Sequence, residues 1–209
     1  KMKNSSADIS PTAGQMPRLL GLALASKLIR HNPGMLVDHR LSNQGNEVAF
    51  GTIGDASTSE GLFWESLNAA GVLQVPMAVS VWDDEFGISV HKSVQTTKQS
   101  ISEALRGFQA GESSPGIHIY QARAWDYPAL MEMYREGIAL CRKDHVPVLF
   151  HVTEVTQPQG HSTSGSHERY KSAERLEWEK EHDCILQMRA FILESGLAKA
   201  EELDKIEEE

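Results

Sequence analysis

Short apolar stretches alternate with longer amphipathic ones along most of the chain. Continuous apolar runs of strand length, such as "VPMAVSVW" at 75–82, are typical of strands buried on both faces of a parallel sheet. Between these runs, apolar residues recur at the three-to-four-residue spacing of a helix that covers one face of such a sheet. The pattern therefore predicts strands and helices in alternation.

Strands are predicted at 46–54, 75–82, 116–124 and 146–155. Helices are predicted at 17–31, 57–71, about 97–110, 126–144 and from about 172 onward. Because parallel neighbouring strands need a crossover connection, this alternation indicates an α/β fold with a mostly parallel sheet flanked by helices.

Several predicted helices carry end signals. Pro17 is tolerated in the first turn of a helix. Ser57 and Glu60 have the spacing of a capping box, and Gly71 is placed to end the same helix. Asp126 is placed to cap the helix at 126–144.

Composition narrows the class of protein. The length of 209 residues predicts a single domain over 1–209, with a helical extension over 172–209. The net charge of −9 argues against a nucleic-acid partner, and no apolar run approaches the roughly 18 residues that a membrane partner would need. The two cysteines do not form a Cys-x-x-Cys pair, which is typical of a cytoplasmic protein with reduced thiols. The polar start and charged end lead us to expect a piece of a longer protein.

Acidic residues follow two neighbouring predicted strands. Asp55 comes after the strand at 46–54, and Asp83 and Asp84 come after the strand at 75–82. The carboxyl ends of parallel strands share one edge of the sheet, where the helix predicted near Ser57 would also offer backbone N–H groups to a phosphate. A diphosphate and the carboxylates would then share a hard divalent ion such as Mg²⁺ or Ca²⁺. The spacing alone equally allows Asp83 and Asp84 to begin an exposed turn.

Three segments together resemble one family. The stretch "GDASTSEGLFWESLNAAGVLQVPMAVSVWDDEFG" at 54–87 resembles the thiamine-diphosphate motif, which opens Gly-Asp-Gly and closes with Asn-Asn. "GHSTSGSHERYK" at 160–171 resembles an active-site loop, and "ISPTAGQMPRLLGLALASK" at 9–27 resembles a helix near the cofactor. The chain thus resembles the α subunit of thiamine-diphosphate-dependent 2-oxo acid dehydrogenases of the branched-chain or pyruvate type, within the transketolase-like superfamily.

The resemblance implies a thiamine-diphosphate-binding fold, with 1–209 as its diphosphate-binding domain. It implies that Mg²⁺ is held by the side chains of Asp55 and Asp84 and by the carbonyl of Phe86. His161 is implied as the catalytic residue that faces the cofactor. The residues implied in cofactor binding are Ser10, Thr12, Gly54, Asp55, Ala56, Ser57 and His161.

The resemblance also implies an activity and partners. The reaction would be oxidative decarboxylation of a 2-oxo acid with acyl transfer to a lipoyl-bearing acyltransferase. In this family the glutamate that activates the cofactor comes from a β subunit or a fused β-type domain. We therefore expect a dimer or heterotetramer, and a chain that is inactive alone.

Two alternatives stay open. One is a relative of transketolase or deoxyxylulose-phosphate synthase, which shares the metal motif but lacks the His-Ser-x-Ser loop that 160–171 resembles. The other is a non-catalytic assembly module with a degenerate motif. Ala56 in place of glycine, and Asp83 and Asp84 in place of Asn-Asn, favour the second alternative.

Overall fold

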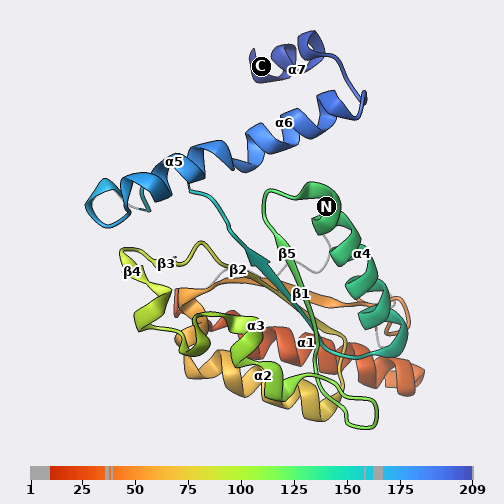
Figure 1. Cartoon of the computed structure of the whole chain (residues 1–209). Coiled ribbons are helices and arrows are strands. Elements are labelled where there is room, and N and C mark those ends of the chain that lie inside the picture. The colour runs from red at the N-terminus through yellow and green to blue at the C-terminus, as the bar shows by residue number, and fades with distance from the viewer. Residues whose placement is uncertain (1–9, 36–37, 39, 158, 162–166, 209) are drawn as a thin grey trace.

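A sheet of four parallel strands lies at the centre of the computed structural model, which describes residues 10–35, 38, 40–157, 159–161 and 167–208. The strands are β1 Ala49–Gly54, β2 Met77–Trp82, β5 His118–Arg123 and β6 Val148–Thr153. Their order across the sheet is β1-β2-β6-β5. Each strand lies inside its predicted range, and the predicted α/β fold with a parallel sheet is confirmed (Figure 1).

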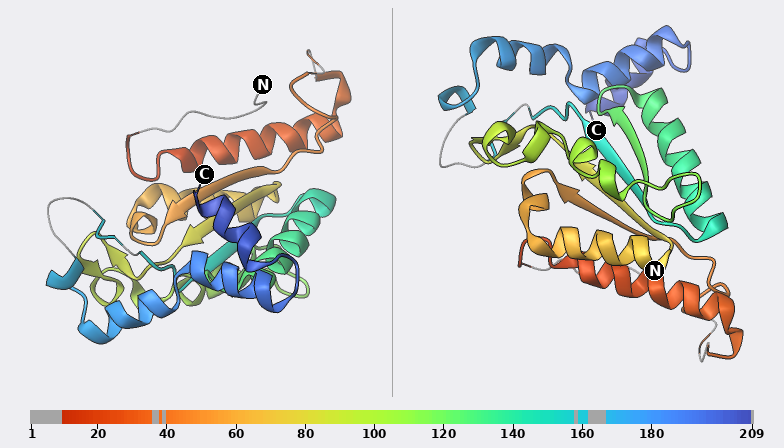
Figure 2. Two further views of the ribbon diagram at one scale, coloured as in Figure 1. Left: turned by 90° about the horizontal axis from the view of Figure 1, so that it is seen from above. Right: turned by 60° about the horizontal axis from the view of Figure 1, so that its bottom comes forward.

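Helices cover both faces of this sheet (Figure 2). On one face, α1 Gln15–His31, α2 Gly61–Leu73 and α3 Ile101–Ala104 enclose the larger apolar core. On the other face, α4 Tyr127–Asp144 packs over β2, β5 and β6. The sheet is therefore buried between two helical layers, which explains why β2 and β6 are almost continuously apolar.

The predicted helix at 126–144 is confirmed together with its cap. Asp126 accepts a hydrogen bond from the backbone N–H of Ala129 at 3.1 Å. At Gly137, α4 comes so close to the sheet that an added Cβ would lie 2.4 Å from Cε1 of Phe150. Glycine at this position allows the helix to reach the sheet.

Two helix predictions are wrong in detail. The capping box does not form: Ala56–Ser59 is a 3-10 turn, and α2 begins only at Gly61. The turn forms because both the N–H and the hydroxyl of Thr58 donate to the carbonyl of Asp55. Gly71 does not end α2, which continues to Leu73.

Gln74 ends α2 instead, with a left-handed backbone at φ 47°. Its side-chain amide donates to the carbonyls of Gly71 and Gly116, at 2.6 and 3.0 Å, and so stabilises this conformation. The carbonyl of Gly116, which is distant in the sequence, therefore helps to end this helix.

The helix predicted at 97–110 is mostly absent. Only α3 is α-helical there, and it is flanked by the 3-10 turns Thr97–Gln99 and Arg106–Phe108. Lys98 and Gln99 have positive φ angles, 62° and 52°, which a helix cannot contain. A short hairpin, β3 Phe86–Gly87 with β4 Val90–His91, was not predicted, because its turn lacks the Asn-Gly or Asp-Gly signal.

The helical C-terminal region is confirmed. It consists of α5 Ala173–Glu181, α6 Cys184–Glu194 and α7 Ala200–Glu208, and the remaining 3-10 turns are Pro33–Met35, Lys92–Val94 and His167–Arg169. Ser172 caps α5, and Asp183 caps α6 by accepting from two backbone N–H groups at 3.0 Å. Figure 1 shows α5 above the β3–β4 hairpin. Among the helices of the described residues, none is both long and apolar enough to cross a bilayer.

Candidate functional site

The acidic residues after β1 and β2 meet at the carboxyl edge of the sheet. Gly54 and Trp82 are register partners at the ends of the two strands, and the N–H of Asp55 donates to the carbonyl of Trp82 at 3.0 Å. Asp55 is 3% exposed and Asp83 is 2% exposed. The predicted clustering of the acids at one edge is therefore present: Asp55 and Asp83 are buried, and Asp84 is partly buried.

Asp83 has partners of its own within the protein. Its carboxylate lies 2.9 Å from Nε2 of the buried His151 on β6, and 3.9 Å from Nζ of Lys92. Nδ1 of His151 is 3.0 Å from the hydroxyl of Ser102. Burial would raise the pKa of Asp83, but the hydrogen bond with His151 and the charge of Lys92 outweigh it and lower the pKa.

Asp55 and Asp84 are less well compensated. Burial, followed by repulsion from Asp83 and Asp84, raises the pKa of Asp55 from 3.8 to about 8. The pKa of Asp84 is also raised, mainly by burial. Within the described part of the chain, Oδ2 of Asp55 is buried and has no hydrogen-bond partner. An oxygen of this kind needs a ligand from outside the protein, and a cation would satisfy it.

The oxygen atoms at this edge suit a hard divalent ion. Asp84 accepts a hydrogen bond from the N–H of Phe86 at 3.1 Å, which folds the backbone of Phe86 back toward the carboxylate. Among the described residues, no group of three or more His, Cys, Asp or Glu side chains is arranged to hold a metal. A cation bound by Asp55 and Asp84 would therefore need further oxygens, from a backbone carbonyl or from a bound ligand.

Ala56, which departs from the motif, is accommodated. It is not among the residues with positive φ, so the backbone there does not require glycine. Its methyl group faces Gly87 of the hairpin, where an added Cβ would lie only 2.7 Å from the Cβ of Ala56. Ser57 follows in the same 3-10 turn, so a ligand at this edge would meet this turn and not the start of α2.

The more distant predicted site residues are not drawn into this cluster. Ser10 and Thr12 are exposed in the turn before α1, and His161 is exposed in a bend after β6. In the described ranges, no hydrogen bond joins any of the three to Asp55 or Asp84. Residues 162–166 of the loop segment lie outside the described residues. The roles of these residues stay predictions.

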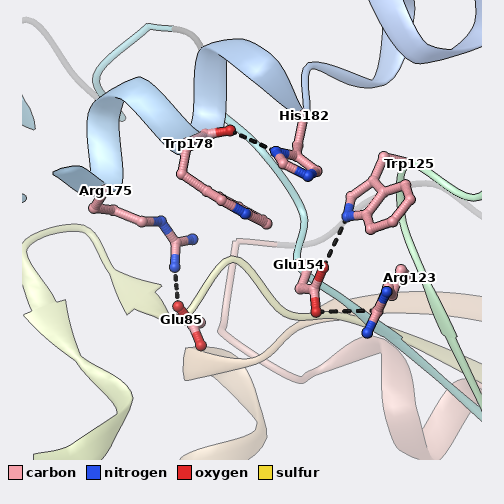
Figure 3. A pocket seen from close by; sticks show the side chains of 7 residues that line it. All are labelled: Glu85, Arg123, Trp125, Glu154, Arg175, Trp178 and His182. Carbon is pink, nitrogen blue, oxygen red and sulfur yellow. Dashed lines mark hydrogen bonds and ion pairs between the residues drawn. The ribbon is translucent and has the colours of Figure 1, made fainter.

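A pocket of about 440 Å³ opens beside the turn that carries Asp84 (Figure 3). Its lining residues lie in β5, β6 and α5 or directly after them, and in the turn after β2: Glu85, Arg123, Trp125, Glu154, Arg175, Trp178 and His182. The charged groups are paired across the pocket: Arg175 contacts Glu85, and Arg123 lies 3.3 Å from Glu154. Sequence reasoning missed these residues, because no motif connects α5 with the turn after β2.

A family model for the dehydrogenase E1 component matches residues 4–209. The chain belongs to this family. The assignment agrees with the resemblance of the three segments, and it favours that resemblance over the transketolase alternative. The α/β sheet with helices on both faces is consistent with an E1 fold.

Individual relatives support the same assignment. The E1 chain is 25% identical over 194 residues to "Pyruvate dehydrogenase E1 component subunit alpha" of Rickettsia bellii, covering 93% of this chain and 52% of that protein. It is 24% identical over 192 residues to "2-oxoisovalerate dehydrogenase subunit alpha" of Bacillus subtilis, covering 92% and 52%. For the pyruvate dehydrogenase α subunit of Acholeplasma laidlawii the identity is 32% over 193 residues, covering 90% and 49%. The E1 chain thus spans about half the length of these relatives.

Proposed function

We propose that this E1 chain supplies the diphosphate and metal half of the active site of a thiamine-diphosphate-dependent 2-oxo acid dehydrogenase. The substrate class is pyruvate or a branched-chain 2-oxo acid, in line with the names of the relatives. The observation that carries the proposal is the buried carboxylate of Asp55 beside Asp84, with one oxygen unpartnered among the described residues. Such an arrangement is costly until a cation joins it.

The proposed ligands of Mg²⁺ are the carboxylates of Asp55 and Asp84 and the carbonyl of Phe86. Gly54, Ala56 and Ser57 would line the diphosphate, with the backbone amides of Ala56 and Ser57 as donors. When bound, thiamine diphosphate supplies an electron sink for loss of CO₂ from a 2-oxo acid. This chain would orient that group, while His151 and Lys92 keep Asp83 ionised and held away from the cation.

The remaining roles require other parts of the enzyme. His161 would orient the reacting acyl group, and Ser10 and Thr12 would lie near the cofactor. A β subunit or fused β-type domain would complete the site, in a dimer or heterotetramer. A lipoyl-bearing acyltransferase would accept the acyl group.

Calorimetric titration of thiamine diphosphate tests the cofactor site. The sample is the longest chain that contains these residues, assembled with its β-type partner, with and without Mg²⁺. We expect Mg²⁺-dependent binding that Asp55→Ala and Asp84→Ala abolish, because each variant removes an oxygen ligand. Asp144→Ala, at the exposed end of α4, is the matched control and should bind as the wild type does.

The assembly-module alternative predicts the opposite result. Three carboxylates crowd this edge because Asp83 and Asp84 stand where the motif has Asn-Asn. If the added negative charge has abolished diphosphate binding, the assembled wild-type enzyme will show no Mg²⁺-dependent heat. That outcome would replace the proposed function with a role in subunit contacts alone.

A further inference from the structure

Glu85 lies between two proposed cation ligands, Asp84 and Phe86, and is held from two sides. Nζ of Lys92 is 2.7 Å from Oε1 of Glu85. On the other side, the guanidinium of Arg175 on α5 donates to the Glu85 carboxylate and, at 3.2 Å, to the backbone carbonyl of Asp84. Arg175 therefore contacts both the backbone and a side chain of the turn that carries the proposed ligands. Figure 3 shows its contact with Glu85.

Arg175 is itself fixed by buried ion pairs. Its Nε donates to Oε1 of Glu179, one turn further along α5, at 2.7 Å. Glu179 also accepts from Nζ of Lys171 at 2.7 and 2.9 Å, and the side chains of Lys171 and Glu179 are 0% and 3% exposed. Buried pairs contribute little net stability, but they tolerate few alternative geometries. The guanidinium is thus presented to the turn in one orientation.

The same segment packs on Phe86. Nζ of Lys171 lies 5.2 Å from the centroid of the Phe86 ring, and the guanidinium of Arg175 lies 5.8 Å from it. The ring of Tyr170 is 5.6 Å away, centroid to centroid. Glu85 itself has a φ of 73°, which is unfavourable for a residue with a side chain and persists only where the surroundings hold it. The contacts from α5 meet this requirement.

We infer that Arg175 is a positioning residue for the cation site: it holds the Asp84–Phe86 turn in ligating geometry through Glu85 and the carbonyl of Asp84. The inference rests on the proposed function, since it concerns the same cation. As a bare positive charge, Arg175 would weaken cation binding. As a positioning group, Arg175 strengthens cation binding. Removing its charge should therefore raise the Kd for the cation if Arg175 is a positioning group, and lower it if Arg175 acts only as a charge.

The test is a titration of Mg²⁺ at saturating thiamine diphosphate, with the longest chain assembled with its β-type partner. In Arg175→Gln we expect the apparent Kd for Mg²⁺ to rise about tenfold, or roughly 1.4 kcal/mol. Arg175→Lys keeps the charge but loses the forked donor, and its Kd should rise in the same direction. An unchanged or tighter Kd in Arg175→Gln would overturn the inference.

Controls separate positioning from general destabilisation. Arg135→Gln removes an exposed arginine paired with Glu132 on α4, and should leave the Kd unchanged. If Arg175→Gln does not fold, Arg175→Lys carries the test, because it keeps a positive charge beside the buried Glu179. Failure of the wild type to bind would overturn the proposed function and this inference together, whereas wild-type binding with unaltered variants overturns the inference alone.

Discussion

At the scale of single residues, the acids at the carboxyl edge of the sheet are of two kinds. Asp83 has a hydrogen bond with His151 and a nearby cation in Lys92, and its pKa is lowered. Asp55 has neither, and its pKa is raised to about 8. His151 is buried on β6, and its Nε2 lies 2.9 Å from Asp83, one of these acids. A cation from outside these residues would compensate the carboxylate of Asp55.

In the metal-free protein, the free energy of unfolding should fall as the pH rises from 3.8 to about 8. Because the pKa of Asp55 is about 8 in the folded protein against an ordinary 3.8, the folded state binds more protons between these values, and unfolding becomes easier with rising pH. In Asp55→Asn the free energy of unfolding should fall less over this range, by on the order of a few kcal/mol, because the titrating carboxyl group is gone. Thermal melts of the metal-free protein near about pH 6 and about pH 9 check this. Equal pH dependence in both proteins would contradict it.

At the scale of elements, close contacts decide which sequence signals take effect. The pattern predicted β2 and β6 because they are almost continuously apolar and buried, and it predicted α4 because its buried residues Met133, Gly137 and Cys141 recur every four positions. It failed at the start of α2, where Thr58 closes a 3-10 turn on Asp55. It failed again at 97–110, where two positive φ angles interrupt the helix. In both places hydrogen bonds or backbone angles of individual residues override the periodic signal.

Two glycines in helices should respond oppositely to the same substitution. Gly137→Ala would place a methyl group about 2.4 Å from the Phe150 ring, and overpacking of this kind costs about 1–3 kcal/mol. Gly21→Ala on α1 meets no atom within 4 Å, and alanine should stabilise that helix by about 0.5–1 kcal/mol. Urea unfolding measures whether each substitution raises or lowers the free energy of unfolding. Stabilisation by Gly137→Ala would refute the close contact.

At the scale of the whole molecule, the first C-terminal helix, α5, contacts the turn next to the candidate site. Arg175 on α5 contacts Glu85, 90 positions earlier in the chain, and both residues line the same pocket. The extension predicted at 172–209 therefore reaches the turn next to the candidate cation site. The chain spans about half the length of its relatives.

This chain alone should show no turnover of pyruvate or of a branched-chain 2-oxo acid. The glutamate that activates the cofactor is expected outside these residues, in the β-type partner. Reduction of a dye electron acceptor in the presence of the 2-oxo acid, thiamine diphosphate and Mg²⁺ provides the assay. Adding the β-type partner should restore the signal, whereas turnover by the chain alone would show that the site is complete without it.

The sequence alone determined the order of strands and helices, the family, and the meeting of Asp55 with Asp83 and Asp84 at one edge. These features follow from local periodicity and from the rule that parallel strands end on the same side. Only the tertiary structure decided which acid is hydrogen-bonded to His151, and that Arg175 holds the turn between Asp84 and Phe86. Such contacts join segments 68 and 91 positions apart, and their geometry depends on how buried side chains of distant elements fit together, which leaves no periodic trace in the sequence.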